Sequence, residues 1–163
     1  MKFYRIKQFF WSITAKISID ELNYVKYHLN SKEFELFLML SVQDQKHSVK
    51  VAKDVERECT RLHLHREELI KTALLHDIGK IYIRLNAIDK SILVLADKFT
   101  SGRIRNIRNS KKIDVYYNHG NIGFEILKSY GLSERAMYLI KNHHSDIKGD
   151  LELEILRSCD GKN

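Results

Sequence analysis

The chain has 163 residues, of which 44% are hydrophobic and 30% charged, and its formal net charge is +7 at pH 7. These values are typical of one globular domain and exclude a mainly disordered chain, and no apolar run approaches the roughly 20 residues that a membrane span needs. Proline is absent and glycine occurs only seven times, so the turn residues that all-β folds use are scarce.

Apolar residues recur at spacings of three and four along most of the chain, which is the period of amphipathic helices. Residues 3–17 show this pattern beside a basic flank, and we expect a helix there that docks on its own domain or on a partner, or lies on a membrane surface. Further helices are predicted from Ser31 onward and over residues 20–29, 43–62, 66–77, 88–99, 113–130, 133–144 and 151–160.

The predicted fold class is all-α, an irregular bundle of seven to nine helices. We expect residues 1–30 to form a helical extension packed on a domain that covers residues 31–163. Two cysteines, Cys59 and Cys159, are too few for a disulfide framework and suit a reducing compartment. Because residues 9–11 form too short an apolar stretch for a signal peptide, the expected localisation is cytoplasmic.

The positive charge is concentrated in residues 1–19 and 98–112, which together carry ten basic residues and no acidic one. Such segments attract phosphates, nucleotides, nucleic acid or anionic lipid, and they can also serve only as a solubilising surface. We expect a phosphorylated small molecule or a nucleotide as the partner and do not favour nucleic acid. The sequence does not predict an oligomeric state.

Several histidines and aspartates fall on stripes that are otherwise apolar, where an unpaired polar side chain is costly. They are His47, His76, Asp77, His119, His143, His144 and Asp160. One inward histidine is ordinary, and a His–Asp doublet alone suits a structural pair as well as a metal site. Several helices that present such groups together favour a shared divalent ion, because neutral imidazole and carboxylate bind zinc, iron and manganese.

Adjacent helix residues point about 100° apart. We therefore expect that His143 and His144, on one helix, do not aim in the same direction. One would bind metal while the other reaches a second metal or the substrate.

The run Ala-Leu-Leu-His-Asp-Ile-Gly-Lys at residues 73–80 resembles the HDIG-type HD-domain superfamily of metal-dependent phosphohydrolases. Gln-Lys-His-Ser-Val at residues 45–49 and Cys-Asp at residues 159–160 extend the resemblance over roughly residues 34–160. The resemblance implies that one metal is bound by His47, His76, Asp77 and Asp160. In a subset of the family a second metal, bridged by the doublet aspartate, is held at positions that match His119, His143 and His144. The implied cofactors are two divalent ions, from among Fe, Mn, Zn, Ni and Mg.

The activity that the resemblance implies is hydrolysis of a nucleotide or another phosphoester. Asp77 would bridge the metals, Lys80 would meet a phosphate oxygen, and Arg103 and Arg105 would gather a polyanionic substrate. The Gly-Tyr-Pro motif of the cyclic-dinucleotide phosphodiesterases does not follow His144, which argues against that specific activity. Two alternatives stay open: an HD-type di-iron oxygenase, and a non-catalytic binding module in which metal only stabilises the helices.

Overall fold

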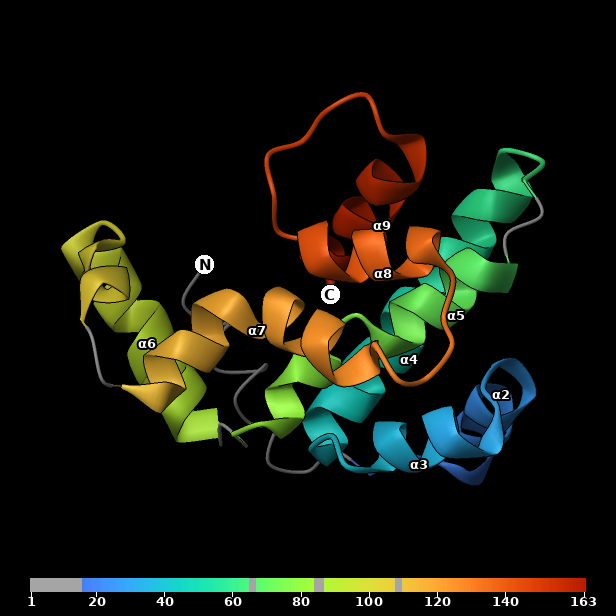
Figure 1. Ribbon diagram of the computed structural model, residues 1–163, viewed down its shortest axis with the longest axis horizontal. Coiled ribbons are helices and arrows are strands. Elements are labelled where there is room, and N and C mark those ends of the chain that lie inside the picture. The colour runs from blue at the N-terminus through green and yellow to red at the C-terminus, as the bar shows by residue number, and fades with distance from the viewer. Residues whose placement is uncertain (1–15, 65–66, 84–86, 108–109) are drawn as a thin grey trace.

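The computed structural model describes residues 16–64, 67–83, 87–107 and 110–163. In these residues the protein has eight α-helices, two short 3₁₀ helices and no strand, so the all-α prediction is confirmed (Figure 1). The elements are α2 (Ile19–His28), α3 (Ser31–Leu38), α4 (Val42–Arg61), α5 (Glu67–Leu75), η1 (Ile78–Ile81), α6 (Ala87–Thr100), η2 (Arg103–Asn106), α7 (Lys111–Leu127), α8 (Glu134–Asn142) and α9 (Leu151–Lys162).

Residues 1–15 lie outside the described residues, so the predicted N-terminal helix and its docking stay predictions. The division of the chain after residue 30 also stays a prediction. Among the residues that the structure describes, no helix is both long and apolar enough to cross a bilayer.

Side-chain N-caps begin six of the helices, in a chain that has no proline to mark their starts. In each case the capping oxygen accepts a hydrogen bond from the backbone N–H three residues later, which satisfies a donor that the helix leaves free. The caps are Ser18, Asn30, Ser41, Ser110, Ser133 and Asp150. The starts of these six helices are therefore determined by residues that are adjacent in the sequence.

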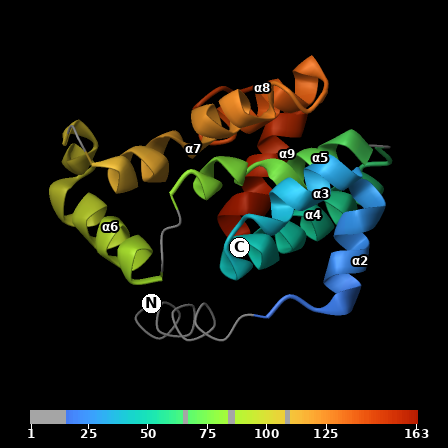
Figure 2. The ribbon, with the colours of Figure 1, turned by 60° about the horizontal axis from the view of Figure 1, so that its bottom comes forward.

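The hydrophobic side chains form two separate clusters. The larger lies among α2–α5, η1, the end of α7, α8 and α9 and contains the buried Phe37, Leu74 and Leu156. The smaller consists of Leu93, Ile104 and Val115 and joins α6 and η2 to the first half of α7. Consequently α6 and η2 form an arm at the opposite end of the molecule from α2, and α7 connects this arm to the main body (Figures 1 and 2).

Close backbone contacts fix α7 against its neighbours. A Cβ atom placed on Gly79 of η1 would lie 1.9 Å from the His119 carbonyl oxygen and 2.7 Å from the Gly123 nitrogen. A Cβ atom on Gly120 would lie 2.9 Å from the Lys141 carbonyl oxygen of α8. Only glycine permits these approaches, so η1, α7 and α8 meet backbone to backbone.

We predict that Gly79→Ala disrupts this contact, because the added methyl group meets main-chain atoms that have no alternative rotamer. The free energy of unfolding should fall by about 3 kcal/mol or more, the upper range for overpacking, as measured by urea unfolding. Gly161→Ala is the matched control, because a Cβ atom there has nothing within 4 Å. Equal stability of the two variants would contradict the assigned close contact.

Candidate metal centre

The histidines and aspartates that the sequence singled out converge on one region of the main body. His47 comes from α4 and His119 from α7, while Asp160 lies on α9. His76 and Asp77 lie between α5 and η1, and His143 and His144 directly follow α8.

Three overlapping groups of potential ligands lie within the cluster, and the third, which consists of His76, Asp77 and His143, links the other two. In the first, His47 Nε2 lies 2.8 Å from Asp160 Oδ1, and His76 Nε2 lies 3.6 Å from the same oxygen. The atoms that these three side chains offer all lie within 4.8 Å of one another. This arrangement has the composition and spacing of a site for one divalent ion.

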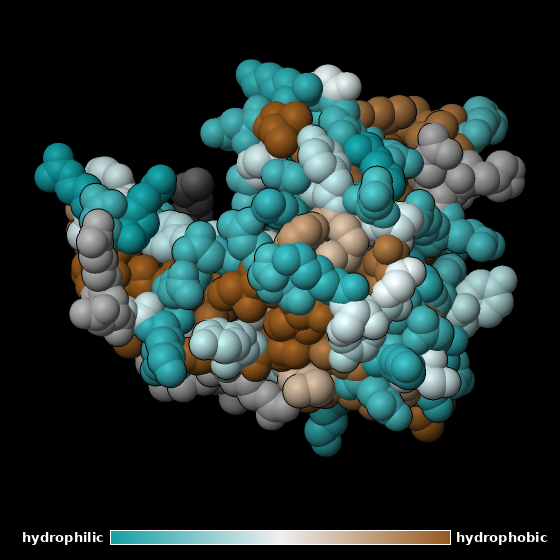
Figure 3. Space-filling model, viewed as in Figure 1, coloured by the Kyte–Doolittle hydropathy of each residue, from teal (hydrophilic) through white to brown (hydrophobic). Residues whose placement is uncertain are grey.

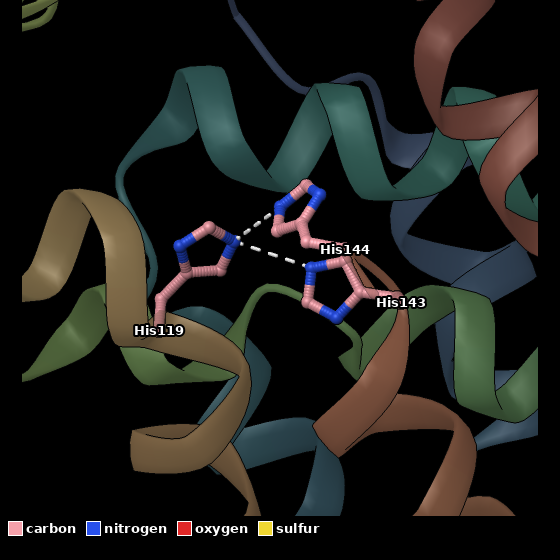
Figure 4. A group of neighbouring side chains, drawn as sticks. All are labelled: His119, His143 and His144. Atoms are coloured by element: carbon pink, nitrogen blue, oxygen red, sulfur yellow. Dashed lines mark hydrogen bonds between the residues drawn. The ribbon is translucent and has the colours of Figure 1, made fainter. Parts of the chain in front are cut away.

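The second group consists of His119, His143 and His144 (Figure 4). The Nε2 atoms of His143 and His144 lie 3.2 and 2.9 Å from His119 Nε2. The expectation that adjacent histidines aim in different directions is wrong, because both Nε2 atoms approach the same nitrogen of His119. The convergence comes from the side chains, since His143 keeps helical backbone angles at the C-cap of α8.

Asp77 lies between the first and second groups. Its Oδ1 atom is 3.2 Å from His119 Nε2, and its Oδ2 atom is 3.6 Å from His76 Nε2 and 3.7 Å from His47 Nε2. Only 1% of its surface is exposed. The two oxygens of one carboxylate therefore face different groups of histidines.

The predicted helix over residues 66–77 is too long, because α5 ends at Leu75 and the doublet lies in the turn before η1. The turn is closed by a hydrogen bond that the backbone N–H of Lys80 donates to the Asp77 carbonyl oxygen, at 2.9 Å. A straight helix would carry residues 79–81 away from α7, whereas the turn lays Gly79 against it. The local apolar pattern does not report this tertiary contact.

Three imidazoles are oriented by main-chain carbonyls. The Nδ1 atom of His76 lies 2.8 Å from the Ala73 carbonyl oxygen, and that of His143 lies 2.6 Å from the Ile140 carbonyl oxygen. His119 Nδ1 lies 3.1 Å from the Val115 carbonyl oxygen. A carbonyl can only accept, so Nδ1 carries the proton in each ring and the lone pair of the neutral ring stays on Nε2.

These tautomers leave the cluster without the partners that buried polar atoms need. His76 Nε2 and Asp77 Oδ1 are buried and have no hydrogen-bond partner among the described residues. The neutral rings of His119 and His143 also face each other with two lone pairs, which repel. A cation between these atoms satisfies both conditions, so the residues present fit a divalent metal ion.

The charges in the cluster shift the pKa values of its members. Burial would raise the pKa of Asp77, but Lys80 and the neighbouring histidines hold it well below its usual value. Burial lowers the pKa of His144 to about 4 and that of His143 well below its ordinary value, and the charge of nearby histidines acts in the same direction. At neutral pH the carboxylate is therefore ionised and these two imidazoles are neutral, the forms that bind metal.

Lys80 reaches the same carboxylate from η1. Its Nζ atom lies 2.5 Å from Asp77 Oδ2. Burial alone would lower the pKa of this amine, but Asp77, together with Asp44 on α4, raises it above its usual value. No local sequence pattern signals that Asp44 lies close to Lys80.

A cleft of about 1380 Å³ leads from the cluster along α7 to the arm. Figure 3 shows the surface hollowed between the arm and the main body. Lys80, His119 and His144 lie at its inner end, and Arg105 and Lys111 line its outer part. Arg103 is exposed on the same turn as Arg105, but it is not among the lining residues.

The cleft also has a wall that the sequence analysis did not identify. Val94 and Asp97 of α6 line it, opposite Asp146 in the segment after α8. Tyr116 and Tyr117 form its floor on α7. The tyrosines could have been expected near the site, because they lie two and three positions before His119 in the sequence. The position of α6 could not, because it depends on tertiary packing.

Comparison with protein families agrees with this geometry. A model of the HD domain matches residues 45–161. The chain therefore belongs to the HD domain family, whose members bind divalent metals and are generally phosphohydrolases. No curated protein and no solved structure gives a significant match to the chain.

For the metal-free protein, kept in chelator, we predict that the free energy of unfolding falls as the pH falls from 6.5 to about 4. His143 and His144 bind protons more weakly in the folded chain than in the unfolded chain, so protons favour unfolding in this window. The pKa of His76 is raised, because Asp77 outweighs its burial. Its contribution therefore has the opposite sign and is lost at higher pH, as the pH rises through its folded value.

Urea unfolding at pH 7 and pH 5 measures this effect. His143→Gln should reduce the difference between the two midpoints, since the glutamine does not titrate. A midpoint at pH 5 that equals or exceeds the midpoint at pH 7 would contradict the lowered pKa values of His143 and His144.

Proposed function

We propose that this HD-domain protein is a phosphohydrolase that uses two divalent ions to hydrolyse a nucleotide or another phosphoester. One observation carries the proposal: among the described residues His76 Nε2 and Asp77 Oδ1 are buried without a hydrogen-bond partner. They lie next to Lys80 and His119, which line the inner end of an open cleft. A bound cation supplies the missing partner, and the cleft gives a substrate access to it. The HD family match supports the same chemistry.

The arrangement of Asp77 favours two ions over one. One ion would be held by His47, His76 and Asp160, and a second by His119, His143 and His144, with one oxygen of Asp77 directed to each group. When bound, such a pair makes a water acidic enough to act as a nucleophile at neutral pH and neutralises the phosphate oxygens. The protein's own residues have to hold these ligands still and bring the phosphate to them.

Lys80 is the side chain that we assign to the phosphate. Its protonated amine is held by Asp77 at the inner end of the cleft and remains partly exposed. It can donate a second hydrogen bond to a phosphate oxygen without leaving the carboxylate, because an ammonium group has three donors. Charge that develops on that oxygen is then stabilised by a donor that is already in place.

Arg105 is placed to hold the distal part of the substrate. Its Nε atom donates to the Gly102 carbonyl oxygen at 3.1 Å, and its guanidinium group lies 5.6 Å from the centre of the Tyr117 ring. The Tyr117 hydroxyl in turn donates to Asp97. Arg105 forms no ion pair with the described residues, so its remaining donors are available to an anionic ligand. We do not assign Arg103 to substrate binding, because it is not among the residues that line the cleft.

The general experiment is elemental analysis of protein purified without chelator, followed by two assays. Phosphate release from a panel of phosphoesters with Mn²⁺ tests hydrolysis, and oxygen uptake by protein loaded with Fe²⁺ tests the di-iron alternative. Phosphate release without oxygen uptake supports the proposal. Oxygen uptake without phosphate release, or a metal-loaded protein that does neither, would refute it.

We predict that Asp77→Ala abolishes phosphate release and lowers the metal content to one ion or none, because it removes the carboxylate that both groups share. Activity and elemental analysis measure the two effects. Asp146→Ala is the control, since this carboxylate lines the cleft outside the cluster and its loss should leave the metal content unchanged. Hydrolysis retained by Asp77→Ala would contradict the bridging role.

We predict that Lys80→Ala lowers kcat about 100-fold, the usual effect of removing one donor to a developing charge, and leaves the metal content intact. Steady-state kinetics and elemental analysis measure the change. Lys111→Ala is the matched control, because this lysine lines the outer cleft and should affect KM more than kcat. Loss of metal from Lys80→Ala would show that the lysine supports the ligands and does not act on the substrate.

A further inference from the structure

The outer side of α6 carries an apolar stripe that no described residue covers. Ile92, Leu95 and Phe99 are 58%, 49% and 85% exposed. Their spacing of three and four places them on one face of the helix. Contiguous exposed apolar side chains of this size generally mark a contact surface.

The other side of the same helix faces the cleft. Val94 and Asp97 line the cleft, and Asp97 accepts the hydrogen bond of the Tyr117 hydroxyl. At 100° per residue these two positions lie on the side opposite Ile92 and Phe99. A partner on the outer face would therefore leave the cleft open to substrate.

The charge around the stripe is basic. Lys98 and Arg103 are exposed and form no ion pair with the described residues, whereas Lys112 nearby is paired with Asp89 at 2.6 Å. Asp97 is the one acidic residue between residues 91 and 107. It is partly buried, and its carboxylate accepts a hydrogen bond from the Tyr117 hydroxyl. The outer face of α6, which we define by Ile92, Leu95, Lys98 and Phe99 together with the adjoining Arg103 of η2, thus combines apolar groups with cations that no described acidic side chain pairs.

We propose that the outer face of α6 docks on the surface of an anionic lipid bilayer. A helix that lies on such a surface presents an apolar stripe to the acyl chains and basic side chains to the headgroups. A second copy of this chain is disfavoured as the occupant, because it would bring two basic surfaces together. Nucleic acid is disfavoured because two of the three stripe residues are aliphatic and offer no ring for a base to stack on. The proposal does not depend on the hydrolytic activity.

Vesicle flotation of the full-length protein tests the proposal. We expect the protein to float with vesicles of phosphatidylcholine and phosphatidylserine at 7:3, and to float less with phosphatidylcholine alone or at high salt. Phe99→Ser should reduce the partition coefficient about ten-fold, as expected for removing one buried aromatic side chain. Lys98→Glu with Arg103→Glu should reduce it only for the phosphatidylserine vesicles.

The control is Tyr27→Ser, because Tyr27 is an aromatic residue of α2 that is 79% exposed at the other end of the molecule. Its partition should equal that of the wild type, and the melting temperatures of both serine variants should be unchanged. A wild type that does not float, or equal flotation of Phe99→Ser and Tyr27→Ser, would overturn the proposal.

Two further outcomes would also overturn it in favour of another occupant. Light scattering that shows a dimer, dissociated by Phe99→Ser, without flotation would assign the face to a second copy. Binding of a 30-nucleotide RNA that is lost in Arg103→Glu, without flotation, would assign it to nucleic acid.

Discussion

The centre of this protein depends on one buried carboxylate. Asp77 is almost fully excluded from solvent, and an ionised carboxylate in such a position costs several kcal/mol unless cations and donors surround it. One of its oxygens meets Lys80, and the other faces His119 without forming a hydrogen bond. The fold has to bring these cationic and imidazole groups from separate helices to a single side chain, and the elements around Asp77 serve this requirement.

The same hydrogen bonds that end two helices also orient their histidines. The last carbonyls of a helix have no partner within it. The carbonyls of Ala73 near the end of α5 and Ile140 near the end of α8 accept from His76 and His143. Each imidazole therefore satisfies a helix end through Nδ1 and directs Nε2 into the cluster. Since the rings are held by the main chain, the ligand atoms are in place before any ion binds, and little ordering is required on binding.

The sequence predicted some parts of this structure because the signals for them are local. The predicted starts of α2 and α8 lie within two residues of the observed ones, and the resemblance to the HD family placed His47, His76 and Asp160 in one centre. The helix ends were predicted less well. Near the ends of α5 and α8, carbonyl groups accept hydrogen bonds from the side chains of His76 and His143, and the apolar pattern does not report these bonds. The convergence of His143 and His144 was missed because it depends on the position of His119, which lies on another helix.

The cleft could not be predicted from the sequence, because its walls are placed by packing between distant residues. Arg103 and Arg105 look equivalent in the basic segment, yet only Arg105 turns over Tyr117 and faces the cleft. The partner that anchors Tyr117 is Asp97, twenty positions earlier and on another helix. Only the three-dimensional arrangement distinguishes a cation that can meet a ligand from one that lies on the outer surface.

Helix α7 separates the chemistry from the recognition of the ligand. Its second half carries Gly120 and Gly123 and is held against η1 and α8 by backbone contacts that tolerate no added atom. Its first half carries Val115 and Tyr117 and packs in the smaller hydrophobic cluster, with α6 and η2. His119 lies where the two halves meet. Because the smaller cluster shares no buried residue with the larger one, substitutions in the arm can alter the outer cleft while the contacts that hold the metal ligands stay unchanged. A fold of this kind can change what it binds without rebuilding the centre that acts on it.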